Sequence, residues 1–263
     1  MQGIIVFFIV LFACSLGSIS GIGGGIIIKP LMDAMGGFSA ASVNHMSSIT
    51  ILTMTTVSIY KSRQNAKVVD WRIVVYFTVG SMAGGVLGNR MLTNFMAGAE
   101  NDGVITIVQS ILQIVFVLIV MANEIWGHKI PRFHVKNGLL MMGVGVGLGI
   151  IAAFLSIGGG LFNRPLLIIM LSLASKPAVF TSLCIIFCAQ LSNVITMGVT
   201  TQFSNVDMSV LPFMMVAAVL SGFIGSYIAS HVDDKYFDRL FFFTLLIILS
   251  LNTFNLLRHL LFM

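Results

Sequence analysis

Two ten-residue stretches of the chain carry similar residue types in the same order. Residues 22–31 hold three glycines, three further residues, Lys29, a proline and a leucine, and residues 157–166 repeat this order with Arg164 as the base. Three glycines interrupt an α-helix, because glycine costs helix stability. A helix that begins after the break presents unpaired N–H groups and the positive end of its dipole. These groups, with a base about one turn further on, have the chemistry that binds a small anion.

The same residues allow a second interpretation, which the sequence leaves open. Glycines also let membrane helices cross closely. A long basic side chain can extend to the lipid headgroups, whereas a base held inside the membrane usually marks function. Lys29 and Arg164 therefore either contact a ligand or reach outward. We assign to helix packing the glycines of other apolar segments, namely Gly85, Gly88, Gly143, Gly145, Gly147, Gly149, Gly222 and Gly225.

The elements that must position these residues are membrane helices. The chain has 263 residues, of which 57% are hydrophobic and 9% charged, and a mean hydropathy of +1.03. Soluble domains carry about 25% charged residues. At about 20 residues per crossing, ten apolar segments can be marked, including a first segment that we interpret as a spanning helix and not a cleaved leader. Their approximate bounds are 3–20, 22–37, 43–60, 71–92, 104–125, 137–155, 158–175, 178–198, 208–230 and 239–259.

The ten segments form two sets of five that align with each other. Residues 22–31 match 157–166 at an offset of 135, and Asp70 falls opposite Asp207 at an offset of 137. This indicates an internal duplication. We predict an N-terminal repeat over 1–126, a cytoplasmic connector over 127–136 and a C-terminal repeat over 137–263.

Because each repeat has five segments, the second is predicted to be inverted. Loop charges agree: Lys61, Arg63 and Lys67 fill the loop after the third segment, whereas its counterpart, 199–207, has no base. The positive-inside bias places the first loop in the cytoplasm and both termini outside. The predicted fold is an all-α integral membrane protein with about ten transmembrane segments in two inverted repeats, each with a Gly-rich helix break. Such repeats are typical of secondary transporters.

Polar residues of the third segments could hydrogen-bond an oxyanion without adding charge, or could join helices to one another. Asn44 and His45 open one of these segments, and Thr181 and Ser182 hold the matching place in the other. The predicted substrate-binding residues are Gly23, Gly24, Gly25, Lys29, Asn44, His45, Ser156, Gly158, Gly159, Gly160, Asn163, Arg164, Thr181, Ser182, Gln190 and Asn193.

Other function classes find little support in the sequence. No basic stripe with interleaved aromatics predicts nucleic-acid binding, and the net charge of +5 is spread over short loops. Cys14, Cys184 and Cys188 lie in apolar runs, which argues against a disulfide framework. There is no spacing for a nucleophile with its base or for a metal cluster. We therefore predict no catalytic residue, no metal, no cofactor and no enzyme activity.

The motif resembles the sulfite exporter TauE/SafE family. That family has two copies of a Gly-x-Gly-Gly-Gly turn followed closely by Pro-Leu, and here the copies begin at Gly21 and at Ser156, with Ser in place of the first glycine. Lys29 and Arg164 stand where the family pattern has an apolar residue. The resemblance covers essentially the whole chain and implies a permease for small anions such as sulfite or sulfonates.

We expect a multi-pass transporter of the cell (inner) membrane that moves a small oxyanion, sulfite or an organosulfonate, by alternating access between the two Gly-rich turns. The alternative is a membrane scaffold or assembly subunit in which the glycines serve packing. The expected partners are the anion and the lipid bilayer, with no nucleic acid. The substrate, the direction, the coupling ion and the oligomeric state, a homo-oligomer included, stay open.

Overall fold

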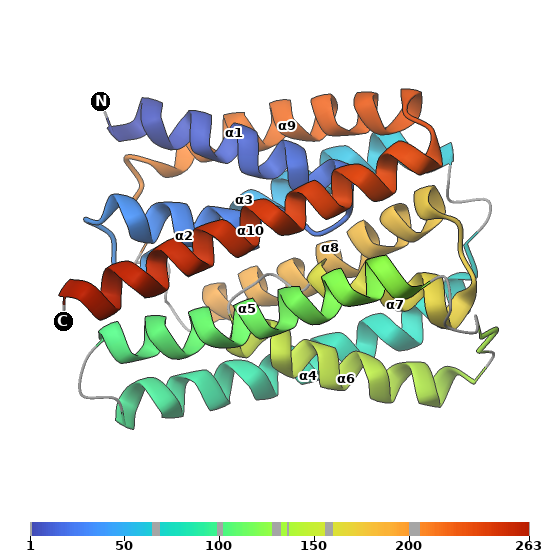
Figure 1. Cartoon of the computed structure of the whole chain (residues 1–263), viewed down its shortest axis with the longest axis horizontal. Helices are drawn as coiled ribbons and strands as arrows, with labels where there is room; N and C mark the ends of the chain where they lie inside the picture. Colours follow the sequence, from blue (N-terminus) through green and yellow to red (C-terminus); the bar gives the residue numbers. More distant parts are fainter. Residues whose placement is uncertain are drawn as a thin grey trace.

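The computed structural model describes residues 2–64, 69–98, 102–127, 133–135, 137–155, 160–199 and 206–262. Within them the chain forms ten α-helices and no strand, and each helix coincides with one predicted apolar segment. Both chain ends lie at the same end of the helix bundle (Figure 1). The helices are α1 (Gln2–Ser20), α2 (Gly25–Met35), α3 (Ala40–Ser62), α4 (Trp71–Gly98), α5 (Asp102–Trp126), α6 (Gly138–Phe154), α7 (Gly160–Leu171), α8 (Ser175–Val199), α9 (Leu211–His231) and α10 (Asp234–Phe262).

Six of the described helices are long and apolar enough to cross a membrane, namely α1, α4, α5, α8, α9 and α10. Helix α3 has 23 residues and is rich in Ser and Thr. Several of these hydroxyls bond back to the carbonyl four residues earlier, as Thr50 does to Met46 at 2.7 Å and Thr55 to Ile51 at 2.8 Å. A hydroxyl satisfied in this way can be buried without a partner on another helix.

The helices that follow the two Gly-rich breaks are short. Helix α2 has 11 residues and α7 has 12, which correspond to about 16 and 18 Å at 1.5 Å per residue. Each is therefore about half as long as the hydrocarbon core of a bilayer is thick. In Figure 1, α2 lies in the half of the bundle that holds both chain ends, and α7 lies toward the opposite end.

Glycines bring α4 and α6 into backbone contact. A Cβ built on Gly84 would lie 2.1 Å from the Val146 carbonyl oxygen, and one on Gly149 would lie 2.2 Å from the Ser81 carbonyl oxygen. Gly80, Gly88 and Gly145 are equally close to the facing backbone. The packing expected of Gly88, Gly145, Gly149, Gly222 and Gly225 is therefore present.

The packing assignment is wrong for three other glycines. A Cβ on Gly85, Gly143 or Gly147 would meet nothing within 4 Å. Residues three or four apart share one face of a helix, whereas residues one or two apart point in different directions. The period of two in residues 143–149 thus places alternate glycines off the contact.

Several inter-helix contacts come in matched pairs along the two halves of the chain. Helix α4 packs on α6, and α9 packs on α1. Likewise α2 contacts α10 while α7 contacts α5, and α3 contacts α9 while α8 contacts α4. Helices α3 and α8 pack on each other, as do α5 and α10.

Matching acids precede the two helices α4 and α9. The carboxylate of Asp70 accepts a hydrogen bond from the Arg72 N–H at 3.1 Å, and that of Asp207 accepts one from the Ser209 N–H at 2.9 Å. The Ser209 hydroxyl also donates to Asp207, and these bonds lower the pKa of that carboxyl. Asp70 therefore caps the first turn of α4, whereas the bonds of Asp207 lie in the turn that precedes α9, whose N-cap residue Val210 makes no side-chain cap bond.

Candidate functional site

The first Gly-rich break is a tight turn that glycine conformations make possible. Gly21 and Gly23 have φ angles of +73° and +75°, a backbone conformation that residues with a Cβ rarely adopt. The N–H groups of both donate to the Gly17 carbonyl, at 3.0 and 3.2 Å. The Gly24 carbonyl accepts from the Ile28 N–H at 2.9 Å and so begins α2.

This turn folds back onto the end of α1. A Cβ on Gly24 would lie 2.9 Å from the Cys14 Cα, and one on Gly17 would lie 2.2 Å from the Gly24 nitrogen. Gly24 therefore has a packing role in the structure, because even a methyl group has no room there. Gly25 is the first residue of α2.

The two Gly-rich breaks touch each other inside the bundle. A Cβ on Gly160, the first residue of α7, would lie only 1.7 Å from the carbonyl oxygen of Ile22 in the first turn. Ile186 of α8 contacts both, since it lies 3.1 Å from a Cβ on Gly23 and 2.7 Å from one on Gly160. The N-terminal ends of α2 and α7 thus lie close together. Ser156, Gly158 and Gly159 lie outside the described residues.

Helix α8 binds the first turn through a side chain as well. The Ser182 hydroxyl is buried and donates to the Gly21 carbonyl at 2.6 Å. The neighbouring Thr181 is fully buried, and its hydroxyl has no hydrogen-bond partner among the residues that the structure describes. The buried N-terminal half of α8 therefore holds one hydroxyl that is hydrogen-bonded and one that has no partner among the described residues.

Lys29 is buried within the bundle, with 8% of its surface exposed. Its ammonium donates to the Gln109 side-chain oxygen of α5 at 2.5 Å. The amide nitrogen of Gln109 in turn donates to the Phe154 carbonyl at 2.8 Å, at the last residue of α6. One glutamine thus connects α2 with the end of the helix that precedes the second break.

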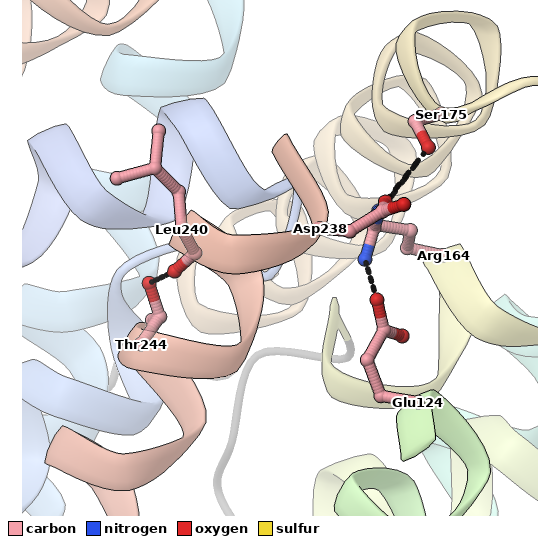
Figure 2. A network of polar contacts seen from close by, with 6 residues as sticks. All are labelled: Glu124, Arg164, Ser175, Asp238, Leu240 and Thr244. Atoms are coloured by element: carbon pink, nitrogen blue, oxygen red, sulfur yellow. Dashed lines mark hydrogen bonds and ion pairs between the residues drawn. The ribbon is translucent and has the colours of Figure 1, made fainter. Parts of the chain in front are cut away.

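Arg164 is the most enclosed charge that the structure describes, with 0% of its surface exposed. Figure 2 shows its guanidinium between two carboxylates, Asp238 of α10 and Glu124 of α5, the latter at 3.5 Å. The Ser175 hydroxyl lies 3.4 Å from the guanidinium and donates to Asp238 at 2.9 Å. The Phe241 ring lies 4.2 Å from the guanidinium carbon, which is cation–π distance. Burial of this kind is not the outward extension to headgroups that the sequence had left open.

The two bases lie too far apart to hold one small anion together. Their partners Gln109 and Glu124 are fifteen residues apart on α5, which is about 22 Å along the axis. The Lys29 ammonium and the Arg164 guanidinium therefore lie at two separate positions in the bundle. The structure therefore gives two cation positions, one for each short helix.

The other predicted residues are more dispersed. Asn44 and His45 are partly buried on α3, and Asn163 is buried on α7 beside Arg164. The amide of Asn193 donates to the Gln190 side-chain oxygen at 3.3 Å on α8. Among the described residues, the contacts given above tie only Ser182 and the glycines directly to the meeting point of the two turns.

Sequence reasoning missed the partners of the two bases. No role was assigned to Glu124 or Asp238 from the sequence, and the structure brings both to Arg164. A buried guanidinium requires a countercharge, and this requirement could have pointed to acids near the ends of other segments. Gln109 and Gln113 stand four apart on α5, and both bond to the end of α6, Gln113 to the Leu155 carbonyl at 3.0 Å.

Comparison with known proteins agrees with the sequence motif. A family model described as "Sulfite exporter TauE/SafE" matches residues 6–253, and this confirms the resemblance. No curated protein and no solved structure matches the chain. The family is one of membrane transporters, and the six long apolar helices agree with a multi-pass membrane protein. The chain belongs to the sulfite exporter TauE/SafE family.

Proposed function

We propose that this protein carries a small oxyanion, sulfite or an organosulfonate, across the cell membrane by alternating access at a site between the two Gly-rich turns. The observation that carries the proposal is the meeting of those turns, where the Ile22 carbonyl abuts Gly160. There the N-terminal ends of two short helices come together. Each end has N–H groups without an intrahelical acceptor and a positive partial charge.

An anion inside a membrane protein needs compensation, because an unpaired charge is costly away from water. Helix N-termini supply it without a mobile countercharge. Lys29 and Arg164 add a full charge on either side of the turns, and their partners Gln109 and Glu124 are about 22 Å apart along α5. We assign them to two successive stations, one at each side of the central site.

We also propose that the chain consists of two inverted repeats of five helices, 1–126 and 137–263, joined by the connector 127–136. The matched helix pairs support this, since exchanging α1–α5 with α6–α10 reproduces the contacts described above for the two halves. Asp70 and Asp207 support it too, since each accepts a hydrogen bond from the N–H two residues further on, just before or at the start of the matching helix. In this arrangement all ten helices enter the membrane, the connector is cytoplasmic and both termini are outside.

One observation favours the alternative, a membrane scaffold. Gly24 and Gly160 both face protein atoms that leave no space for a methyl group, as glycines that serve packing would. A ligand at the turns would therefore have to meet the backbone N–H groups and not the Cα atoms of these glycines.

Counterflow in liposomes distinguishes transporter from scaffold. Proteoliposomes loaded with unlabelled sulfite or methanesulfonate are diluted into the labelled anion, beside protein-free liposomes. A transporter accumulates label transiently above the level of protein-free liposomes. Loading with chloride or acetate in place of sulfite is the second control: a site specific for oxyanions of sulfur gives no accumulation, whereas a general anion pore does not distinguish the anions. Label that stays at the protein-free level for every anion would refute the proposal.

A further inference from the structure

We infer that Glu124 and Asp238 form a proton-binding site that couples the passage of the anion at Arg164 to one proton. The inference deepens the proposed function and rests on it. It names the coupling ion, a proton, and the residues that take it up. The geometry that points to it is the enclosure of one guanidinium by two carboxylates on two other helices (Figure 2).

The charges at this place do not balance. Arg164 contributes one positive charge and the two carboxylates contribute two negative charges, so the ionised group has a net charge of minus one. The guanidinium is fully buried, the Glu124 side chain is 17% exposed and the Asp238 side chain is 52% exposed. An excess charge in such surroundings is costly, and a proton on either carboxylate removes it.

The carboxylates occupy the donors that an oxyanion would need. Glu124 accepts from one terminal nitrogen of the guanidinium, and Asp238 accepts from the other. The Nε atom is buried, and no residue that the structure describes accepts from it. An anion that binds Arg164 while both acids stay ionised would bring three negative charges to one positive charge. Protonation of one acid frees a donor and removes one of those charges in the same step.

The other groups around the guanidinium do not change this balance. From α8 the neighbour is the Ser175 hydroxyl, which is neutral, and from α10 it is the Phe241 ring. Lys176 directs its ammonium to the Phe237 ring at 6.0 Å, and Arg239 lies over the Tyr236 ring at 5.9 Å. The two acids and Arg164 are thus the ionisable groups of this network among the described residues.

The network also explains why a proton would control movement. Arg164 joins α7 to α5, α8 and α10 at once, so the short helix is held while both acids are ionised. The more exposed acid, Asp238, is the one that meets the proton first. Anion and proton then move together past Arg164, and one anion with one proton carries no net charge.

The test uses a probe whose own charge does not change with pH. Methanesulfonate is the anion of a strong acid, so any pH dependence of its transport belongs to the protein. Purified full-length protein is placed in liposomes with the membrane potential clamped at zero by potassium and valinomycin. The accumulation ratio of labelled methanesulfonate is measured with an inward gradient of one pH unit.

The wild-type protein is expected to accumulate the probe about tenfold, because one proton per anion transmits the tenfold difference in proton activity. Asp238→Asn lowers the ratio to about one, and Glu124→Gln does the same. Asp238 is half exposed, so its variant keeps the test open if Glu124→Gln does not fold. The matched control is Asp233→Asn, an exposed acid five residues away, which keeps the tenfold ratio.

Two results would overturn the inference: wild-type counterflow with an accumulation ratio near one, or a tenfold ratio that survives in Asp238→Asn. Absence of wild-type counterflow at equal pH is a different failure, since it refutes the proposed transport itself. A pH indicator gives a third measurement on the wild type. Binding of methanesulfonate takes up about one proton per anion, and uptake of none contradicts the coupling.

Discussion

Gly160→Ala is the substitution that acts most directly on the contact between the two turns. The added Cβ would lie 1.7 Å from the Ile22 carbonyl oxygen and 2.7 Å from the Ile186 side chain. Real Cβ atoms essentially never lie within 3.0 Å of such a neighbour. The two turns must therefore separate by about 1.3 Å, since a backbone carbonyl cannot rotate away as a side chain can. Overpacking of this kind typically costs about 1–3 kcal/mol.

The assay is thermal unfolding of the detergent-purified protein together with counterflow in liposomes. For a chain of this size, the expected loss lowers the unfolding midpoint by about 2–12 °C. Transport falls as well, because separation of the turns misplaces both helix N-termini relative to the anion. The matched control is Gly147→Ala on the preceding helix, where a Cβ meets nothing within 4 Å.

Because alanine favours helix over glycine by about 1 kcal/mol, Gly147→Ala is expected to keep or raise the midpoint and to leave transport intact. The reasoning would be refuted if Gly160→Ala matched Gly147→Ala in both measurements. It would then follow that the turns do not touch in the functional protein. A lower midpoint with full transport would preserve the packing argument and refute the placement of the site.

Three further predictions follow from contacts of the same kind. Gly84→Ala should lower stability by about 1–3 kcal/mol, because its Cβ would meet the backbone of α6. Gly85→Ala, one residue away on α4, faces open space and should not lower it. The thermal unfolding midpoints of the two variants test this difference. Ser182→Ala should cost about 1 kcal/mol, because it leaves the buried Gly21 carbonyl without its hydroxyl donor. Gln109→Leu should cost about 1–3 kcal/mol of stability, because the Lys29 ammonium and the Phe154 carbonyl lose their contact with the glutamine. It should also weaken methanesulfonate binding, which calorimetry measures.

The positions of the helices could be predicted from hydropathy alone. Apolar runs of sufficient length mark each helix, and the glycine breaks mark the two places where a helix stops inside the bundle. The repeat also indicated that the two turns belong together. These signals are local or periodic, so they survive in a single sequence.

The partners of the two bases could not be predicted in the same way. Glu124 precedes Arg164 by forty residues and Asp238 follows it by seventy-four, and no periodicity links them. Which acid reaches a buried base depends on how helices are rotated and how far they slide, and glycines such as Gly84 determine this through packing. The same dependence explains why Gly143 and Gly147 face away from α4 although their spacing suggested contact.

The most direct test of the account asks whether an anion passes beside α8 at the meeting point of the turns. Cys14, Cys184 and Cys188 are first replaced, and Ser182→Cys is introduced into this background, with Val199→Cys, an exposed position on the same helix, as control. The rate of modification by a membrane-impermeant thiol reagent is measured with and without saturating methanesulfonate. If the anion binds between the two turns, it slows modification at position 182 several-fold and leaves position 199 unchanged. An unchanged rate at position 182, in protein that still transports the anion, would contradict a site between the two glycine turns.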